Sequence, residues 1–525
     1  MTFNREPVGN SVTDIVLFDG SPLSAQQIAR IAARAVQVQL STAVEFVASI
    51  NRGAEFLQKL WQENGVIYGV TTGYGDSCET GVPADLVPEL PQHLFTFHGC
   101  GLGAHFSPEE TRAILAARLA SLARGKSGVR YELLQALTAL IQADILPLIP
   151  QEGSVGASGD LTPLSYVAAV LAGERDVLYN NKIQPAREAL NACGLTPIKL
   201  QPKETLALMN GTAVMTGLAC LALQRAQYLA QLSARITSVA VLALRGNAAH
   251  FDPLLFAVKP HPGQNQIAAW IHDDLLAAAA SREGLRLQDR YSLRCAPHVI
   301  GVLQDSLPWL TQFIETELNS ANDNPIIDGD GEHVLHGGHF YGGHIAFAMD
   351  SLKNAIANIA DLLDRQLAQL VDVKMNHGLP PNLTGAEGAR RSINHGFKAV
   401  QIGVSAWTAE ALKLTMPASV FSRSTECHNQ DKVSMGTIAA RDCLRVLQLV
   451  EQVAAATLLG ACQGLQLRMR QGELALASLS APIRAQLEGV QSIAPFLAED
   501  RALESALRAL VDAIQQQQWS LYAAH

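Results

Sequence analysis

The sequence has few aromatic and few charged residues, and its cysteines form no recognisable pairs. Phe, Trp and Tyr make up 6% of the 525 residues and charged residues 17%. The eight cysteines are scattered without a C-x-x-C pair, which argues against disulfides and zinc and favours buried, reduced thiols. His336 and His339 stand three residues apart, but no carboxylate or cysteine completes a metal site with them. We therefore expect no metal.

The sequence also lacks an excess of basic residues, the pattern of a leader segment and a long uninterrupted apolar run. The formal net charge is -9 and the pI about 5.9, so nucleic acid is not an expected partner. Residues 1–10 lack a basic region followed by an apolar core, so no secretory signal is expected. The apolar tract 206–244 is interrupted by Gln and Arg residues, which indicates a buried core helix and not a membrane span. These absences predict a cytoplasmic protein.

Helix formers dominate what is present. Ala, Leu and Gln are abundant, and apolar residues recur with helical spacing along most of the chain. The pattern predicts an all-α protein with one short strand at residues 14–19. The expected helices are 24–34, 41–63, 107–125, 131–146, 164–172, 213–249, 346–373, 399–414, 437–465 and much of 482–524.

The stretch G-S-V-G-A-S-G-D-L-T-P-L-S, residues 153–165, predicts more than a turn before a helix. Thr162 is a suitable N-cap and Pro163 suits the first helical position. That interpretation does not explain three small residues in a row. If the nitrogen of Gly159 attacks the carbonyl of Ala157, a five-membered ring closes. Loss of water from the ring and from Ser158 then leaves an electron-poor alkene, and Gly159 does not hinder the nucleophile.

The extended motif G-x-x-G-A-S-G-D-L-x-P-L-x-x resembles the signature of the aromatic amino acid ammonia-lyases and the related aminomutases, over nearly the whole chain. In that family Ala-Ser-Gly matures without help into 4-methylideneimidazole-5-one (MIO), here from Ala157, Ser158 and Gly159. The resemblance implies a long central helical bundle of the aspartase/ammonia-lyase type, with a smaller mixed N-terminal region that carries the MIO loop. We expect domains at 1–200 and 201–480, a helical tail at 481–525, and a homotetramer with active sites shared between subunits.

A glycine-rich loop, I-Y-G-V-T-T-G-Y-G, ends at Gly75 and contains Tyr68. Read alone, Tyr68 is an ordinary tyrosine at the end of a strand. The family resemblance makes it the residue that removes the β-proton of the substrate, on a hinged lid. That role requires a phenol that ionises more readily than usual. The resemblance also places Gly75 and Leu161 at the substrate pocket.

The run L-F-T-F-H-G-C-G-L-G aligns Phe97 and His98 with the family residues around the far end of the substrate ring. Phe97 suits an aryl ring, and His98 offers a hydrogen bond to a phenol or an imidazole. A histidine paired with a backbone carbonyl and remote from any ligand is the alternative. The run also resembles bacterial tyrosine and phenylalanine lyases of the aryl-polyene pathway type.

Three further motifs match the family. Asn210, in L-A-L-M-N-G-T, is expected beside the MIO and the substrate amine, and Asn324, in N-D-N-P, at the substrate carboxylate. Phe340 is expected to stabilise charge near the substrate. The neighbouring His339 replaces an asparagine that is common in the family, so the local hydrogen bonding is expected to differ.

The segment Q-D-R-Y-S-L-R-C-A-P supplies the expected carboxylate ligand, Arg294, whose guanidinium matches a carboxylate in a bidentate manner. Tyr291 lies one helical turn earlier and is expected beside the MIO as a catalytic residue. Gln288, one more turn back, is expected to line the same wall.

The substrate is predicted from a few contacts. Asn429 and Gln430 lie in C-H-N-Q-D-K-V-S-M-G, where histidine lyases place a glutamate at the position of Gln430. A neutral amide suits an uncharged aryl ring, so we rank tyrosine first, phenylalanine second and histidine last. The predicted products are ammonia and a trans-arylacrylate, without metal, nucleotide or pyridoxal phosphate. An aminomutase that uses the same MIO, and a non-catalytic helical scaffold, are the alternatives.

Overall fold

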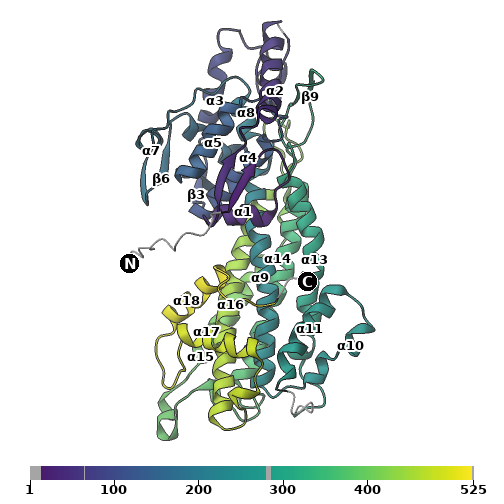
Figure 1. The fold of residues 1–525 in the computed structure, drawn as a ribbon, viewed down its shortest axis with the longest axis vertical. Helices are drawn as coiled ribbons and strands as arrows, with labels where there is room; N and C mark the ends of the chain where they lie inside the picture. Colours follow the sequence, from purple (N-terminus) through teal and green to yellow (C-terminus); the bar gives the residue numbers. More distant parts are fainter. Residues whose placement is uncertain (1–13, 64, 279–284, 523–525) are drawn as a thin grey trace. The chain divides into compact units, whose positions relative to one another are not determined.

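The computed structural model describes residues 14–63, 65–278 and 285–522, so the N-terminal segment in which we expect no secretory signal lies outside it. The chain divides into two compact units, each assembled from three segments (Figure 1). Unit 1 comprises Met1–Leu221, Thr311–Met349 and Pro417–Arg441, and unit 2 comprises Ala222–Leu310, Asp350–Met416 and Asp442–His525. The expected domains at 1–200, 201–480 and 481–525 stay a prediction.

Unit 1 combines helices with short two- and three-stranded sheets. Its β-strands pair as β1 with β2 in parallel, and as β3–β5, β4–β6–β7 and β8–β9 in antiparallel order. The strands are β1 (Ile15–Phe18), β2 (Gln37–Leu40), β3 (Leu102–His105), β4 (Leu146–Pro147), β5 (Pro150–Glu152), β6 (Asp176–Tyr179), β7 (Lys182–Pro185), β8 (Ile326–Asp328) and β9 (His333–Leu335). The helices are α1 (Ala25–Ala32), α2 (Val44–Gln62), α3 (Leu90–Phe97), α4 (Pro108–Leu122), α5 (Tyr131–Ala143), α6 (Leu161–Leu171), α7 (Ala186–Ala192) and α8 (Glu204–Met209), with 3-10 turns at Gly75–Glu79, Val87–Glu89 and Ala418–Phe421.

Unit 2 is helical. It contains α10 (Pro253–Ala257), α11 (Pro262–Leu276), α12 (Tyr291–Arg294), α15 (Lys398–Lys413), α17 (Ala481–Ile493) and α18 (Glu504–Gln515), with 3-10 turns at Ala248–Phe251, Pro381–Leu383, Gly388–Ile393 and Leu476–Ser478. Four long helices contribute residues to both units: α9 (Ala213–Ala243), α13 (Ala296–Leu318), α14 (Gly343–Val371) and α16 (Gly436–Arg470). The predominantly helical fold expected from the sequence is confirmed.

Most predicted elements form where local signals place them. Ser24 accepts a hydrogen bond from the backbone N–H of Gln27 and caps α1, and Ser107 caps α4 in the same way, with Pro108 as its first residue. The predicted strand is β1. Helix α9 is shorter than predicted and ends at Ala243, because Arg245 adopts a left-handed conformation (φ 54°) just beyond it.

Three local predictions are wrong. Helix α6 begins at Leu161 with Asp160 as its N-cap, not at Thr162, and the side chain of Asp160 makes no cap bond to α6 because it binds elsewhere. Gln288 does not continue the helical turn of Tyr291, because α12 starts only at Tyr291 and Arg290 is extended. In the tail, helix α18 ends at Gln515, before the end of the predicted helical segment at residue 524.

Polar side chains tie the long helices of unit 2 together. Arg225 of α9 forms a bidentate pair with Glu451 of α16, at 2.8 Å for both contacts. Gln366 of α14 donates to Thr237 of α9 at 2.9 Å. These contacts place α9, α14 and α16 side by side within the unit (Figure 1).

Gly436–Arg470 is apolar and long enough to cross a membrane, but 83% of its most apolar window is buried inside the protein.

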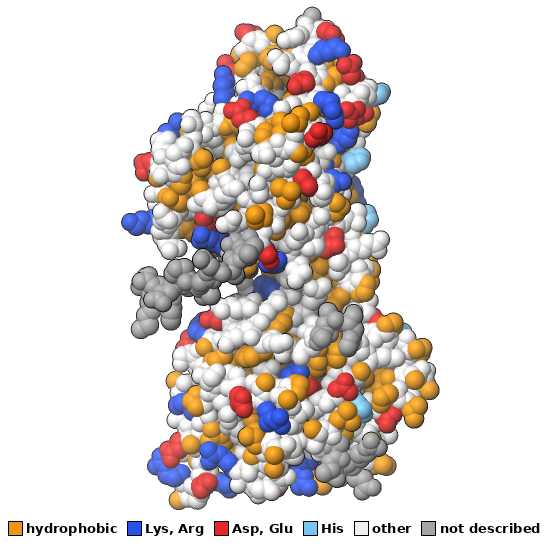
Figure 2. Space-filling model, in the orientation of Figure 1, with side chains coloured by type: hydrophobic (Ala, Val, Ile, Leu, Met, Phe, Trp, Pro, Cys, Tyr) orange, Lys and Arg blue, Asp and Glu red, His pale blue; other side chains and the backbone are white. Residues whose placement is uncertain are grey.

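The surface mixes charges of both signs. On the face drawn in Figure 2, Lys and Arg side chains are interspersed with Asp and Glu side chains over the described residues. The formal charge of -9 is therefore not gathered in one acidic region of that face.

A buried ion pair anchors the last described residues to unit 2. Arg235 of α9 donates to Asp274 of α11 at 2.9 Å, and both side chains are almost fully buried. The hydroxyl of Tyr522 donates to the same carboxylate at 2.6 Å, and its ring stacks on Trp270 with centroids 4.5 Å apart. These contacts hold Tyr522 against α9 and α11.

Arg235→Met is expected to lower the free energy of unfolding of unit 2 by about 3–5 kcal/mol, because Asp274 is left charged and buried without a cation. Combining it with Asp274→Leu is expected to recover part of that loss. Urea unfolding followed by circular dichroism checks both. Arg508→Met, which removes an exposed pair with Glu504, is the control and is expected to change little. An equal loss in the control would contradict the account.

Candidate active site

A pocket of roughly 710 Å³ lies within unit 1, and every described residue that lines it belongs to that unit. It is open to solvent, and the side chain of Phe97 on its wall is 58% exposed. Segments far apart in the sequence meet there. Twelve of the residues predicted from the sequence line this pocket: Tyr68, Gly75, Phe97, His98, Ala157, Ser158, Leu161, Asn210, Asn324, Phe340, Asn429 and Gln430.

The Ala157-Ser158-Gly159 segment has an unusual backbone held by a second segment. Ser158 has φ 48° and Gly159 has φ 76°, in the left-handed region that favours glycine. The backbone N–H of Gly211 donates to the carbonyl of Ser158 at 3.1 Å, and the N–H of Asp160 donates to the carbonyl of Gly211 at 2.8 Å. A Cβ atom at Gly159 would overlap the carbonyl of Gly211, so only glycine fits there.

Asp160 fixes the end of this segment to another helix. Its carboxylate accepts the backbone N–H groups of Val214 and Met215 at 3.0 and 3.1 Å, at the N-terminus of α9, and the hydroxyl of Thr437. The side chain is fully buried. Burial raises the pKa of Asp160 to about 6, although the hydrogen bonds from Thr437, Met215 and Val214 oppose the rise. The carboxylate satisfies helix N–H groups that otherwise have no acceptor.

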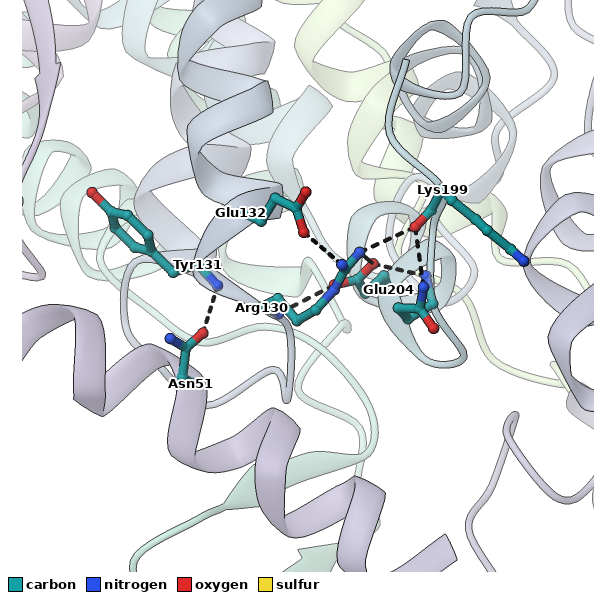
Figure 3. Close-up of polar contacts among 7 residues, drawn as sticks. Asn51, Arg130, Tyr131, Glu132, Lys199 and Glu204 are labelled. Carbon is teal, nitrogen blue, oxygen red and sulfur yellow. Dashed lines mark hydrogen bonds and ion pairs between the residues drawn. The ribbon is translucent and has the colours of Figure 1, made fainter. Parts of the chain in front are cut away.

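Asn210 is positioned by α8, which ends directly before it. The guanidinium of Arg130 binds Glu204, the first residue of α8, through Nε at 2.9 Å and Nη2 at 2.8 Å (Figure 3). Arg130 also binds the carboxylate of Glu132 and the carbonyl of Lys199, so the start of α8 is held from several sides (Figure 3). A fixed α8 in turn holds Asn210 at the pocket wall.

The side chain of Asn210 is nearly fully buried and only partly satisfied. Its Nδ2 donates to the carbonyl of Asn324 at 2.8 Å, whereas its Oδ1 is buried without a hydrogen-bond partner among the described residues. A buried amide oxygen without a donor is costly unless another group reaches it. Together with the left-handed, side-chain-free backbone at Gly159, this orphaned oxygen fits a site built to hold a group formed from the Ala157-Ser158-Gly159 segment.

Tyr68 reaches the loop that follows it. The backbone N–H of Gly75 donates to the phenol oxygen of Tyr68 at 2.7 Å, and Gly75 has φ 60°. A carboxylate oxygen of Glu426 accepts the backbone N–H of Asp76 at 2.7 Å, and the other accepts Nδ2 of Asn429 at 2.8 Å. A Cβ atom at Gly75 would overlap the Glu426 carboxylate. Glu426 therefore joins the loop that follows Tyr68 to the segment that contains Asn429.

The pKa of Tyr68 lies above its ordinary value of 10 in this chain, chiefly because the phenol is buried, while the hydrogen bond from Gly75 lowers it and the Glu426 carboxylate raises it. Unit 1 alone therefore does not provide the easily ionised phenol that the expected role of Tyr68 as a base requires. A cation placed next to Glu426 would remove one of the causes of the rise.

The expected ring end of the pocket carries neutral polar groups. The rings of Phe97 and His98 are 4.5 Å apart. Burial, and secondarily the charge of Arg175, lower the pKa of His98 to about 4, so the imidazole is neutral near pH 7. The amide oxygen of Gln430 accepts the hydroxyl of Thr425 at 2.8 Å. Such groups can both donate to and accept from a substrate ring.

Histidines also stand near Tyr68. His336 lines the pocket, with its ring edge-on to that of Tyr68 at 6.4 Å, and Phe340 and Tyr341 line it too. His339, which replaces the asparagine common in the family, is absent from the pocket wall as described. In the described part of the chain, no group of three or more His, Cys, Asp and Glu side chains is arranged to hold a metal ion.

Gln288, Tyr291 and Arg294 belong to unit 2 and are not among the described residues that line this pocket. Tyr291 and Arg294 do share one helical turn as predicted, with the guanidinium 4.7 Å from the ring centroid. Tyr291 is 72% exposed, and Nε of Arg294 donates to the carbonyl of Asp289 at 2.8 Å. The expected roles of these three residues stay predictions.

The sequence motifs assign no role to several residues at or beside the site, among them Glu426, Asp160 and Arg118. Glu426 lies one residue before the C-H-N-Q segment and lines the pocket. Asp160 directly follows the reactive glycine, and its position in the motif was the available signal. Arg118 is fully buried in α4 and donates to the carbonyl of Asn210 at 3.1 Å. Nothing in the local sequence of α4 distinguishes Arg118 from a surface arginine.

The low pKa of His98 makes stability depend on pH. Between about pH 4 and pH 6.5 the unfolded chain binds a proton at this histidine and the folded chain does not, so stability rises with pH across that window. His98→Leu removes this contribution. The variant is expected to lose less melting temperature than the parent when the pH falls from 7 to 4.5. Melting curves at both pH values check this, and equal losses in the two proteins would contradict it.

Comparison with known proteins identifies the family of this chain. A family model for aromatic amino acid lyase matches residues 23–488. A histidine ammonia-lyase from Geobacillus sp. (strain WCH70) is 36% identical, over 97% of this chain and 98% of its own length. The solved structure of tyrosine aminomutase from Streptomyces globisporus superimposes with a TM-score of 0.88 and 33% identity, over 96% of this chain and 97% of that one. Histidine ammonia-lyase from Trypanosoma cruzi gives a TM-score of 0.86 and 30% identity, over 96% and 94% of the two chains. The chain belongs to the aromatic amino acid lyase family and is a carbon–nitrogen lyase.

Proposed function

We propose that this enzyme eliminates ammonia from an aromatic L-amino acid and that its Ala157-Ser158-Gly159 segment matures into MIO. The observation that carries the proposal is the convergence, on one pocket, of this left-handed segment, the buried Asn210 with its unpaired oxygen, and the phenol of Tyr68. MIO is an electrophile that engages the α-amine and turns it into a better leaving group.

Tyr68 takes the β-proton in this proposal, with the N–H of Gly75 stabilising the phenolate by hydrogen bonding. Glu426 lies on the same wall and binds the ammonium group of the incoming substrate. Neutralising Glu426 removes one cause of the high pKa of Tyr68, so the bound substrate helps to ionise its own base.

The described lining of the pocket includes Lys432 but no arginine, so a guanidinium that could bind the substrate carboxylate in a bidentate manner comes from outside this lining. We propose that Arg294 binds the carboxylate, with Asn324 on the same side, and that Tyr291 and Gln288 approach with it. An open pocket whose carboxylate ligand lies in the other unit fits a homotetramer in which neighbouring subunits complete each site. A cytoplasmic location is part of the same proposal.

For the substrate, the comparisons favour histidine over the tyrosine preference expected from the sequence, because the Geobacillus relative is named a histidine ammonia-lyase. The neutral His98 and the amide of Gln430 suit an imidazole as well as a phenol, since both rings need one donor and one acceptor. We propose histidine as the first candidate. Tyrosine is the second, because Gln430 lacks the charge of the glutamate that histidine lyases place there.

A parallel ultraviolet assay of the purified enzyme with histidine, tyrosine and phenylalanine tests the proposal by following the conjugated acrylate. Urocanate as the main product is the expected result. Coumarate or cinnamate as the main product would transfer the assignment to the aryl substrates, and a β-amino acid among the products would indicate aminomutase activity. An intact mass without the loss of two waters, together with no product, would refute the lyase proposal.

Tyr68→Phe is expected to lower kcat by about 10²–10⁴-fold, because the base is lost while the binding surface remains. The intact mass of the variant is expected to show the same loss of two waters as the parent. Tyr341→Phe, on the pocket wall but without a proposed proton role, is the matched control. Parental kcat in Tyr68→Phe would rule out this residue as the base.

A further inference from the structure

Arg118 is a buried cation next to the Ala157-Ser158-Gly159 segment that the elimination step does not use. Its side chain is 0% exposed. Nη2 donates to the hydroxyl of Ser121 at 2.8 Å and to Oδ1 of Asn322 at 3.3 Å, both neutral groups. Two buried carboxylates act on the guanidinium from nearby: that of Asp323, which is paired with Lys203 at 2.5 Å, and that of Asp160. Burying a guanidinium against neutral acceptors is expensive, so its position calls for an explanation.

The explanation lies in a chain of hydrogen bonds through one peptide group. Nη1 of Arg118 donates to the carbonyl of Asn210 at 3.1 Å. That carbonyl and the N–H of Gly211 belong to the same peptide, and this N–H donates to the carbonyl of Ser158 at 3.1 Å. A charged donor at one end of a peptide polarises it and strengthens its N–H as a donor at the other end.

The contact between Arg118 and the Asn210–Gly211 peptide requires a glycine at position 211. A Cβ atom at Gly211 would overlap Nη1 of Arg118, and the residue has φ 147°. Because glycine has no side chain, the guanidinium can approach the peptide closely. The N-G turn is thus a point of contact between a buried charge and the Ser158 carbonyl.

The Ser158 carbonyl is where charge develops when the alkene forms. Loss of water from Ser158 breaks its Cα–H and Cβ–O bonds and forms the Cα=Cβ bond, and the proton and hydroxide leave together as one water. Electron density from the breaking Cα–H bond spreads onto the adjacent Ser158 carbonyl oxygen. A preorganised donor aimed at that oxygen lowers the barrier.

We propose that Arg118 is a positioning residue for maturation: through the Asn210–Gly211 peptide it polarises the Ser158 carbonyl and accelerates dehydration of Ser158. This inference rests on the proposed function, because it concerns formation of MIO. It assigns to a residue of α4 a role in building the electrophile, separate from substrate binding.

The test follows maturation by intact mass, not by activity. Protein synthesis is stopped after a short induction, and samples purified over time are scored for the fraction that has lost both waters. Arg118→Met is expected to slow the loss by about tenfold, since the donor strength of one peptide N–H falls. Arg118→Lys, which keeps the charge but not the fork, is expected to mature at an intermediate rate.

Arg468→Met is the matched control. Arg468 is also fully buried and donates to the backbone carbonyls of Ala243 and Asn376, but it lies in unit 2 and also pairs with Glu473 at 2.7 Å. It is expected to lower stability and to leave the maturation rate at the parental value.

Parental maturation in Arg118→Met would overturn the proposal, as would equal slowing in Arg468→Met. If Arg118→Met does not fold by circular dichroism, Arg118→Lys decides: slower maturation supports the proposal and a parental rate overturns it. If the parent itself never loses the two waters, the proposed function fails. If the parent loses them and the Arg118 variants keep pace, only the role of Arg118 fails.

Discussion

The site depends on a close backbone pairing between the Ala157-Ser158-Gly159 segment and Gly211. Two hydrogen bonds, from Gly211 to Ser158 and from Asp160 to Gly211, hold the two strands of chain against each other. The approach is possible because Gly159 has no side chain at the contact, where a Cβ atom would overlap the carbonyl of Gly211. Ring closure brings a backbone nitrogen to a backbone carbonyl, and only a segment held this tightly keeps those atoms in position.

Buried polar groups keep that pairing rigid. Asp160 joins the segment to the start of α9 and to Thr437, while Lys203 and Asp323 join the start of α8 to the Asn322–Asn324 turn. Each of these groups would be costly to bury alone, and each is satisfied by a partner from a distant part of the sequence. Unit 1 therefore holds together three separate segments of chain at the place where chemistry is proposed.

Within this framework, we expect a small number of side chains to set the selectivity for the substrate. Family membership rests on residues 23–488, whereas the proposed ring end of the pocket involves only Phe97, His98 and Gln430. Relatives of this fold include a histidine ammonia-lyase and a tyrosine aminomutase. One fold can carry different activities, because selectivity depends on a few contacts with the substrate.

The sequence by itself determined the helical class, the starts of most predicted helices and twelve of the residues that line the pocket. Capping residues such as Ser24 and Ser107 act within one turn, and the motifs around Tyr68, Ser158 and Asn210 carry their chemistry in adjacent residues. Only the tertiary structure decided where the side chain of Asp160 binds, that Glu426 closes on the Tyr68 loop, and that Arg118 reaches Asn210. Those contacts join residues between 54 and 350 positions apart, and no local propensity encodes a partner at such a distance.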